Sequence, residues 1–240
     1  MHELVRANPL GTLTTGIKHP KHPFLQSSHI PWVLDTPIEP AADGTVPLGT
    51  LRGHIARMNP QSKAMVESLA EGSVELTDDV LVLFTVPTHS YVTPKFYAAT
   101  KPSTGKVVPT WNYSAVQAYG RLKLFHADDE RSSSFLQQQI SDLSAQEEAS
   151  AGHDAPWQVS DAPSTYIKQL KRAIVGLEIE ITRLEGKNKM SQELPLADRE
   201  GVVAGFKALR TDASRDMATM VQQRSDEVEA VLAIKKARHA

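Results

Sequence analysis

The order of strand-like and helix-like segments is the feature that most constrains the fold of this chain. About six or seven short apolar or alternating segments are typical of β-strands, and a few helical patterns interrupt them without regular strand–helix–strand alternation. A doubly wound parallel sheet or a (β/α) barrel requires that alternation. The pattern therefore favours a mainly β protein with flanking α-helices, built as a small closed or split antiparallel barrel.

The strand segments differ in how they are expected to be covered. Pro31 lacks an N–H donor, so its segment is predicted to be an edge or bulged strand. Val80 to Val86 is nearly all apolar, which predicts a central strand covered on both faces. Ile174 to Leu184 alternates and predicts a half-buried strand. The predicted strands are 10–17, 24–35, 48–57, 80–86, 107–110, 114–125 and 174–184.

Helical patterns are expected over 61–69, 128–150, 164–173, 197–209 and 212–238. Asn59 followed by Pro60 is a strong start signal, since Asn caps orphan N–H groups and Pro suits the first helical position. Residues 1–8 resemble the last turns of a helix that ends before Pro9, which suggests that a longer parent sequence has lost its start. The last helix carries an apolar stripe that should pack on its own body or on a partner: Met217, Met220, Val221, Val228, Val231 and Leu232.

One aromatic and basic stretch, Thr88 to Tyr113, contains no acidic residue. Pro94, Pro102 and Pro109 fix φ and withhold donors, so the stretch cannot form one regular element. Its composition suits a planar anionic ligand, and it equally suits a packed loop between two strands. Its aromatic and basic residues are Tyr91, Lys95, Phe96, Tyr97, Lys101, Lys106, Trp111 and Tyr113.

Composition excludes several classes of function. The chain has no cysteine, so disulfides and cysteine-ligated metal centres are excluded. The formal net charge of −2 does not support nucleic-acid binding, although a local basic patch would permit it. No apolar run approaches the roughly 20 residues needed to span a bilayer, and the N-terminus lacks a signal-peptide pattern. We therefore expect a cytoplasmic protein without a membrane partner.

The sequence contains no familiar catalytic motif. Gly105-Lys106 imitates the end of a phosphate loop, but Val107 stands where a Ser or Thr would hold magnesium. His19 and His22 lie in a proline-flanked loop rather than on one helix face. The remaining histidines near strands (His29, His54 and His89) are expected to be hydrogen-bonding groups at strand ends. We therefore expect no metal site, and no catalytic residue stands out.

Several cations and amides could meet an anion. Arg52 and His54 share one face of a predicted strand, and Arg57 lies on the other face near a helix start that offers free N–H groups. Residues 187–192 add two lysines, a hydroxyl and two amides, although such a run is also typical of a solvated turn. Spacing alone thus indicates a planar anionic ligand without naming it.

Seven segments together carry a family resemblance. They are N-P-L-G-T-L-T-T (8–15), H-P-F-L-Q-S-S-H-I-P-W-V-L-D (22–35), L-R-G-H-I-A-R-M-N-P-Q (51–61), S-Y-V-T-P-K-F-Y (90–97), V-V-P-T-W-N-Y-S-A-V-Q-A-Y-G (107–120), I-V-G-L-E-I-E-I (174–181) and K-N-K-M-S-Q with D-R-E-G-V-V-A-G-F (187–192, 198–206). They occur in order from about residue 8 to 210. In these segments the chain resembles the PaiB-like FMN-binding negative transcriptional regulators.

The resemblance implies an antiparallel split β-barrel of Greek-key type, similar to pyridoxamine-phosphate oxidase and flavin reductases. It implies a barrel domain over 1–210, a helical extension over 211–240, and a homodimer with two FMN sites at the interface. Haem is the alternative cofactor, because similar barrels bind or degrade it. Arg57 and Lys189 are expected at the phosphate, and Tyr91 or Trp111 at the ring. The implied cofactor-binding residues are Ser28, His29, His54, Arg57, Asn59, Tyr91, Pro94, Trp111, Asn112, Lys189, Ser191 and Gln192.

Two departures from the family pattern affect these expectations. The family usually opens with a fuller first helix, and its late motif ends in Asn where this chain has Glu193. A carboxylate at that position would oppose phosphate binding if it pointed inward. The resemblance implies a flavin-binding protein, either an FMN-dependent oxidoreductase or, as the family name says, a transcriptional regulator.

Overall fold

The computed structural model describes residues 1–36 and 46–238. The chain divides into two compact units, each described below by itself. The barrel unit comprises residues 1–84 and 116–185, and the helical unit comprises residues 85–115 and 186–240. The resemblance predicted another division, with a barrel domain over 1–210 and a helical extension over 211–240. That division stays a prediction.

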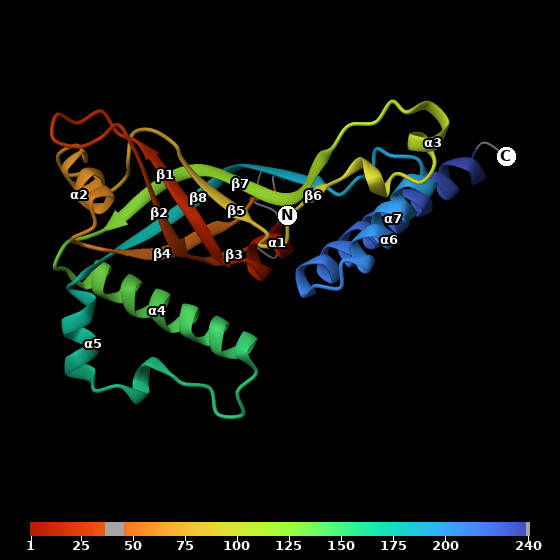
Figure 1. The fold of residues 1–240 in the computed structure, drawn as a ribbon. Coiled ribbons are helices and arrows are strands. Elements are labelled where there is room, and N and C mark those ends of the chain that lie inside the picture. The colour runs from red at the N-terminus through yellow and green to blue at the C-terminus, as the bar shows by residue number, and fades with distance from the viewer. Residues whose placement is uncertain (37–45, 239–240) are drawn as a thin grey trace. The chain divides into compact units, whose positions relative to one another are not determined.

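The elements follow the expected order of short strands interrupted by helices (Figure 1). The strands are β1 (Leu10–Gly16), β2 (Leu25–Pro31), β3 (Val33–Asp35), β4 (Thr50–Ala56), β5 (Val80–Thr85), β6 (Ser90–Val92), β7 (Thr110–Phe125) and β8 (Ile174–Lys189). The helices are α1 (His2–Ala7), α2 (Pro60–Glu67), α3 (Thr100–Thr104), α4 (Glu130–Ala151), α5 (Ser164–Lys171), α6 (Leu196–Ala208) and α7 (Asp212–Ala237), with 3₁₀ turns η1 (Pro94–Phe96) and η2 (Val159–Asp161).

The sheet curls because its two edge strands are consecutive in the chain. The strand order is β2-β1-β5-β7-β8-β4-β3, with β6 added beside β7. β2 ends at Pro31 and β3 begins at Val33, so Trp32 alone joins the opposite ends of this order. β2 also contacts β4, which brings the two ends together. The registered pairs β1–β2, β1–β5, β3–β4 and β4–β8 are antiparallel, and the predicted antiparallel split barrel with flanking helices is confirmed.

The barrel core is built by alternation along each strand. In β4, Leu51, Gly53 and Ile55 point inward, while the residues between them are half-buried. Gly120 of β7 lies so close to β8 that an added Cβ would be 2.0 Å from the Glu180 carbonyl oxygen. The largest buried side chains of this core are Trp32, Phe84, Leu13, Ile30, Leu51, Met65, Leu122, Leu124, Leu177 and Ile179.

Helix α2 is fixed on the barrel by one buried amide. Asn59 caps the helix as predicted, accepting from the Gln61 N–H at 2.8 Å. The Gln61 Nε2 group donates to the Leu13 carbonyl (3.2 Å), the Thr15 hydroxyl (3.0 Å) and the Gln26 carbonyl (3.1 Å). The amide therefore ties the first turn of α2 to both β1 and β2.

Helix α4 contacts β3 and β4 in the barrel unit (Figure 1). Arg52 of β4 forms ion pairs with Asp35 of β3 and with Asp142 of α4, the second at 2.8 Å. Both carboxylates raise the pKa of Arg52, with the hydrogen bond to Asp35 the largest cause and burial opposing them. The strand face that the sequence assigned to Arg52 and His54 is thus the face that α4 covers.

The helical unit has its own apolar core. Phe206 of α6 packs with Met217 and Val221 of α7, and its ring meets Phe96 edge-on at 5.3 Å between centroids. The first half of α7 therefore packs within its own unit, as the apolar stripe suggested. Further along α7, Val231 and Leu232 are exposed.

Three local predictions need correction. Residues 107–109 are not a strand, and a single strand, β7, runs without interruption from Thr110 to Phe125. The run 187–192, whose composition is typical of a solvated turn, is strand as far as Lys189, because β8 continues beyond the alternating segment. β5 buries Val80, Val82 and Phe84 while its other residues are less covered, so it is not buried equally on both faces. In the described part of the chain, no helix has both the length and the apolar character to cross a membrane.

Candidate functional site

Two half-exposed aromatic rings stand next to each other in the helical unit. Tyr91 of β6 is the register partner of Trp111 of β7, and the ring centroids lie 6.3 Å apart in an edge-on arrangement. Trp111 donates its indole N–H to His89 Nδ1 at 3.2 Å. Tyr91 and Trp111 are 49% and 48% exposed. Rings that stay accessible while one is held by a hydrogen bond can stack on a planar ligand.

A lysine is held against the backbone of the strand that carries Trp111. Lys189, at the end of β8, donates to the Trp111 carbonyl at 3.1 Å and to the Thr110 hydroxyl. An ammonium group has three N–H donors, and these contacts use two. The cation is therefore held in place with donor capacity left for an anion.

A buried polar pair lies beneath the same strand. Asn112 is the residue after Trp111 and points to the opposite face, where its Nδ2 donates to Ser191 Oγ at 3.0 Å. Both side chains are buried. Ser191 has a φ of 62°, in the left-handed region that non-glycine residues seldom adopt. Such a conformation costs roughly 1–3 kcal/mol and concentrates at ligand sites, so Ser191 is a candidate functional position.

The two remaining predicted residues of this unit have local roles. Gln192 closes its own turn, because its amide accepts from the Met190 N–H at 2.6 Å and donates to the Asn188 carbonyl at 2.7 Å. Pro94 begins the 3₁₀ turn η1, whose cap is Thr93. Glu193, the departure from the family motif, is exposed.

In the barrel unit, the structure joins Ser28 and Asn59. Asn59 Nδ2 donates to Ser28 Oγ at 3.1 Å while its carbonyl oxygen caps α2. His29, the next residue of β2, alternates with Ser28 and is exposed. His54 instead faces α4, where its Nδ1 lies 2.7 Å from Gln139 Oε1. His29 and His54 thus have separate surroundings.

Arg57 has a structural task that its sequence position did not reveal. Its guanidinium donates to the carbonyls of His126 (2.9 Å), Arg172 (3.1 Å) and Ile174 (3.3 Å), which joins the end of β7 to the start of β8. The residue also lines a cavity of about 300 Å³ together with further cations, Lys168, Lys171 and Arg172.

Acidic groups share that cavity. Asp128 and Asp129 also line it, and Asp129 caps α4. A hydrogen bond from the Ser132 backbone N–H is the main cause that lowers the pKa of Asp129 below its usual value. The cavity therefore has mixed charge, with the cations in excess.

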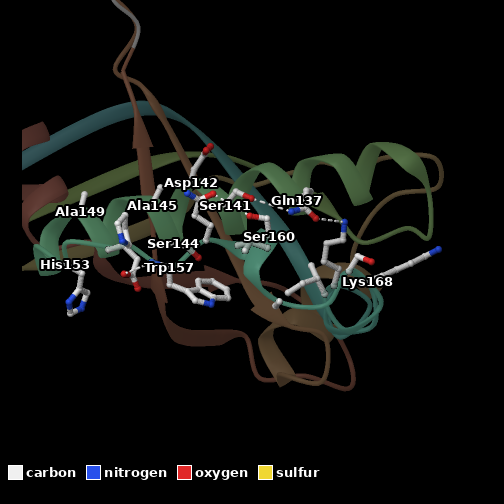
Figure 2. A pocket seen from close by; sticks show the side chains of 18 of the residues that line it. Gln137, Ser141, Asp142, Ser144, Ala145, Ala149, His153, Trp157, Ser160 and Lys168 are labelled. Carbon is white, nitrogen blue, oxygen red and sulfur yellow. Dashed lines mark hydrogen bonds between the residues drawn. The ribbon is translucent and has the colours of Figure 1, made fainter.

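A second cavity of the barrel unit, of about 850 Å³, lies between α4 and the segment that leads through η2 into α5. Figure 2 shows residues along it, with His153 below Ala149 at one end, Trp157 below Ser144, and Lys168 toward the end where Gln137 lies. None of the predicted cofactor-binding residues lines this cavity among those that the structure describes. Its size alone therefore does not mark it as the site that the sequence resemblance implied.

The structure thus brings the predicted residues together in part. Tyr91, Trp111, Asn112, Lys189 and Ser191 form one cluster in the helical unit, which we call the Trp111 cluster. Ser28 with Asn59 forms a second pair, in the barrel unit. Sequence reasoning missed Thr110 and did not link His89 to Trp111. Thr110 is contacted by Lys189 at the end of β8, and His89 stands just before β6, so both contacts are visible only once the strands are paired.

The fold and the Trp111 cluster together define a class of protein. It is an antiparallel split barrel that carries a cluster of aromatic and cationic side chains. The chain belongs to the family described as "Putative FMN-binding domain", whose profile matches residues 1–183. This confirms the recognition of an FMN-binding family, and the family's description agrees with FMN as the expected cofactor.

Relatives extend over most of the chain. An uncharacterised protein of Emericella nidulans is 53% identical over 234 residues, covering 94% of this chain and 92% of that protein. An uncharacterised protein of Aspergillus fumigatus is 50% identical over 242 residues, covering 94% and 93%. The "Protease synthase and sporulation protein PAI 2" of Bacillus subtilis is 25% identical over 174 residues, covering 72% of each chain.

Among solved structures, an FAD and haem binding protein from Mycobacterium smegmatis has a TM-score of 0.44 at 14% identity, covering 78% of this chain and 68% of that chain. A pyridoxamine 5'-phosphate oxidase-related, FMN binding protein from Nostoc punctiforme has a TM-score of 0.38 at 8% identity, covering 78% and 81%. Similarity at this level says nothing about what this chain binds.

Proposed function

We propose that this protein binds FMN and that Tyr91 and Trp111 of the Trp111 cluster contact the isoalloxazine ring. The observation that carries the proposal is the half-exposed pair Tyr91–Trp111 beside a fixed cation, in a chain of an FMN-binding family. The donor set suits this cofactor, because FMN combines a flat ring with a phosphate. When bound, FMN supplies hydride or electron transfer, and the protein contributes orientation and electrostatics.

Lys189 and Arg57 are the two candidates for the phosphate, and they differ in how many of their donors already make hydrogen bonds within the protein. Lys189 uses two of its three donors, so a phosphate adds a contact without breaking one. Arg57 already donates to three carbonyls, so binding through it must share the guanidinium. We therefore favour Lys189 as the stronger phosphate ligand, with Arg57 acting mainly on the stability of the barrel.

Titration of the purified chain with FMN and with riboflavin tests this proposal, because the two ligands differ only in the phosphate. A hydrogen bond to a charged group contributes about 1.5–3 kcal/mol, which is roughly a 10- to 100-fold change in affinity. We expect Lys189→Ala to weaken FMN binding by that factor and riboflavin binding hardly at all. Lys187→Ala, an exposed neighbour on the same strand, is the matched control.

Three results would count against the proposal. Equal losses for FMN and riboflavin would remove Lys189 from the phosphate. Failure of the wild-type chain to bind FMN at micromolar concentration would remove the cofactor. A Soret band with haemin, in the absence of FMN binding, would favour haem instead.

The proposals about oligomeric state, enzymatic reaction and DNA binding rest on the same site. We infer a homodimer with the flavin at the interface, because Tyr91 and Trp111 are open to a second copy as well as to a ring. Light scattering should give twice the mass of one chain, and a monomer that binds FMN fully would overturn the interface. Reduction of bound FMN by a nicotinamide cofactor would support an oxidoreductase. Steeply salt-dependent binding to duplex DNA would support a regulator instead.

A further inference from the structure

Two histidines and a glutamate come together on the barrel unit, and none of them is among the predicted cofactor-binding residues. His19, His22 and Glu67 each offer one ligand atom, and these atoms lie within 4.8 Å of one another. Both His19 Nε2 and His22 Nε2 approach the same Glu67 oxygen, at 3.8 Å and 3.2 Å. In a tetrahedral zinc site with bonds of about 2.0–2.1 Å, neighbouring ligand atoms are about 3.3 Å apart. The two distances between the histidines and Glu67 are thus close to those around a coordinated ion.

Local structure holds the two imidazoles side by side. His19 and His22 form an antiparallel bridge in the loop between β1 and β2, and their ring centroids are 4.8 Å apart. Each histidine precedes a proline, Pro20 or Pro23, which disfavours helical backbone and keeps both residues extended. The side chains are only 16% and 13% exposed, so they lose little further freedom on binding an ion.

The carboxylate reaches this loop because α2 is docked on the same two strands. Gln61 ties the start of the helix to β1 and β2, and Glu67 is the last residue of α2. The C-terminal end of a helix carries partial negative charge, so a carboxylate there is unfavourable unless a cation compensates it. The last turn of α2 contains no basic residue. A cation bound at the cluster would therefore offset this partial charge.

We propose that His19, His22 and Glu67 bind a divalent transition-metal ion, for which Zn²⁺ is the probe. Two imidazoles and a carboxylate are ligands of borderline character that suit zinc and its neighbours rather than Mg²⁺ or Ca²⁺. Three protein ligands leave a fourth position open, which is the pattern of catalytic rather than structural zinc. A depression of about 410 Å³ lined by Ile17, Lys18, His19, His22 and Phe24 adjoins the two histidines and gives a small ligand access to that position.

Two features of the loop limit the affinity of this cluster for Zn²⁺. His19 Nδ1 accepts from the Lys21 N–H at 3.3 Å, and coordination through Nε2 moves the ring proton to Nδ1 and gives up this contact. At that length the hydrogen bond is weak, so its loss costs little. Lys18 and Lys21 also belong to the same loop and repel a cation. We therefore expect micromolar rather than picomolar binding of Zn²⁺.

The experiment is a titration of the full, untagged chain with ZnCl₂ against a chromophoric chelator, at neutral pH. We expect one zinc ion per chain, and a thermal midpoint that rises with zinc. His22→Gln and Glu67→Gln should each weaken binding at least about 10-fold, since loss of even an outer partner of a metal ligand costs 10- to 100-fold. His153→Gln and Glu71→Gln change exposed residues outside the cluster and should bind zinc as the wild type does.

Each outcome decides the proposal. Because the Glu67 side chain is 42% exposed, Glu67→Gln should fold normally, which circular dichroism can verify before the titration. Cobalt substitution gives a second readout, since tetrahedral Co²⁺ bound by the wild type should show visible bands that Glu67→Gln lacks. No zinc binding at micromolar concentration, or equal binding by Glu67→Gln and the wild type, would overturn it.

Discussion

Asp198 is a buried carboxylate that anchors the proposed flavin-facing stretch, and its loss should destabilise the helical unit. It has no exposed surface, and it accepts from the Ala99 N–H at 2.7 Å, from the Thr100 N–H at 3.1 Å and from the Thr100 hydroxyl. Burial by itself would raise the pKa of Asp198, but these hydrogen bonds hold it below its usual value. The carboxylate thus fixes the start of α3 to the first turn of α6.

In Asp198→Asn, the shape is kept and one acceptor oxygen becomes an NH₂ donor. That donor then faces an N–H or hydroxyl donor, so at least one hydrogen bond to a charged group is lost. Such a bond contributes about 1.5–3 kcal/mol. We expect the free energy of unfolding to fall by about 2–3 kcal/mol at neutral pH. Urea denaturation measures the loss, and hydrogen exchange at residues 99–105 locates it.

The dependence on pH gives an independent check. Because the folded-state pKa is lowered, the contribution of Asp198 is present above its unfolded pKa of about 4 and is lost as the pH falls through the folded value. The difference in the free energy of unfolding between wild type and Asp198→Asn should therefore become smaller below about pH 4. Asp216→Asn on the exposed side of α7 is the control. This reasoning would be refuted if the free energy of unfolding of Asp198→Asn lay within about 0.5 kcal/mol of the wild-type value at pH 7. It would also be refuted if the difference between the two stayed constant as the pH fell.

Three further predictions concern stability and titration. Gly120→Ala places a Cβ 2.0 Å from the Glu180 carbonyl oxygen, so we expect a loss of about 1–3 kcal/mol or more in urea denaturation, and a neutral result would contradict the close approach of β7 and β8. Gln61→Ala removes the amide that joins α2 to β1 and β2, and should lower the thermal midpoint by an amount equivalent to about 1–3 kcal/mol, whereas the exposed Gln138→Ala should not. Tyr97 should ionise at higher pH than a free tyrosine, because burial first and the Glu193 carboxylate second raise its pKa, and the difference between wild type and Tyr97→Phe in alkaline absorbance titration measures it.

Much of the fold was predictable because its signals are local. Asn59 and Pro60 marked the start of α2, and Pro31 marked its segment as an edge strand, which is where β2 lies in the sheet. Alternation located β4 and the first part of β8. The end of β8 was missed because residues 186–189 are polar and glycine-bearing, and composition there resembles a turn. Pairing between strands, rather than local preference, keeps them extended.

The candidate site was predictable only through resemblance. Asn112 and Ser191 are 79 residues apart, and no spacing rule joins them. The carbonyls that Arg57 binds are invisible in a sequence, since every residue has one. The sequence analysis weighed His19 and His22 as metal ligands and set them aside, because Glu67 reaches the histidines only after Gln61 docks α2. Chemistry that depends on strand register or helix docking therefore had to come from the structure.

Trp32 has a consequence for how the chain folds. Bringing the two edges of a sheet together normally requires closing a loop, and the entropy cost of closure grows with the length of that loop. Here the edge strands β2 and β3 are separated by a single residue, so almost no chain has to be immobilised to join them. The slow step should instead be the pairing of β4 with β8, which brings together residues more than a hundred positions apart. A chain cut at Trp32 would keep every paired strand, yet it would lose the covalent link between the two edges.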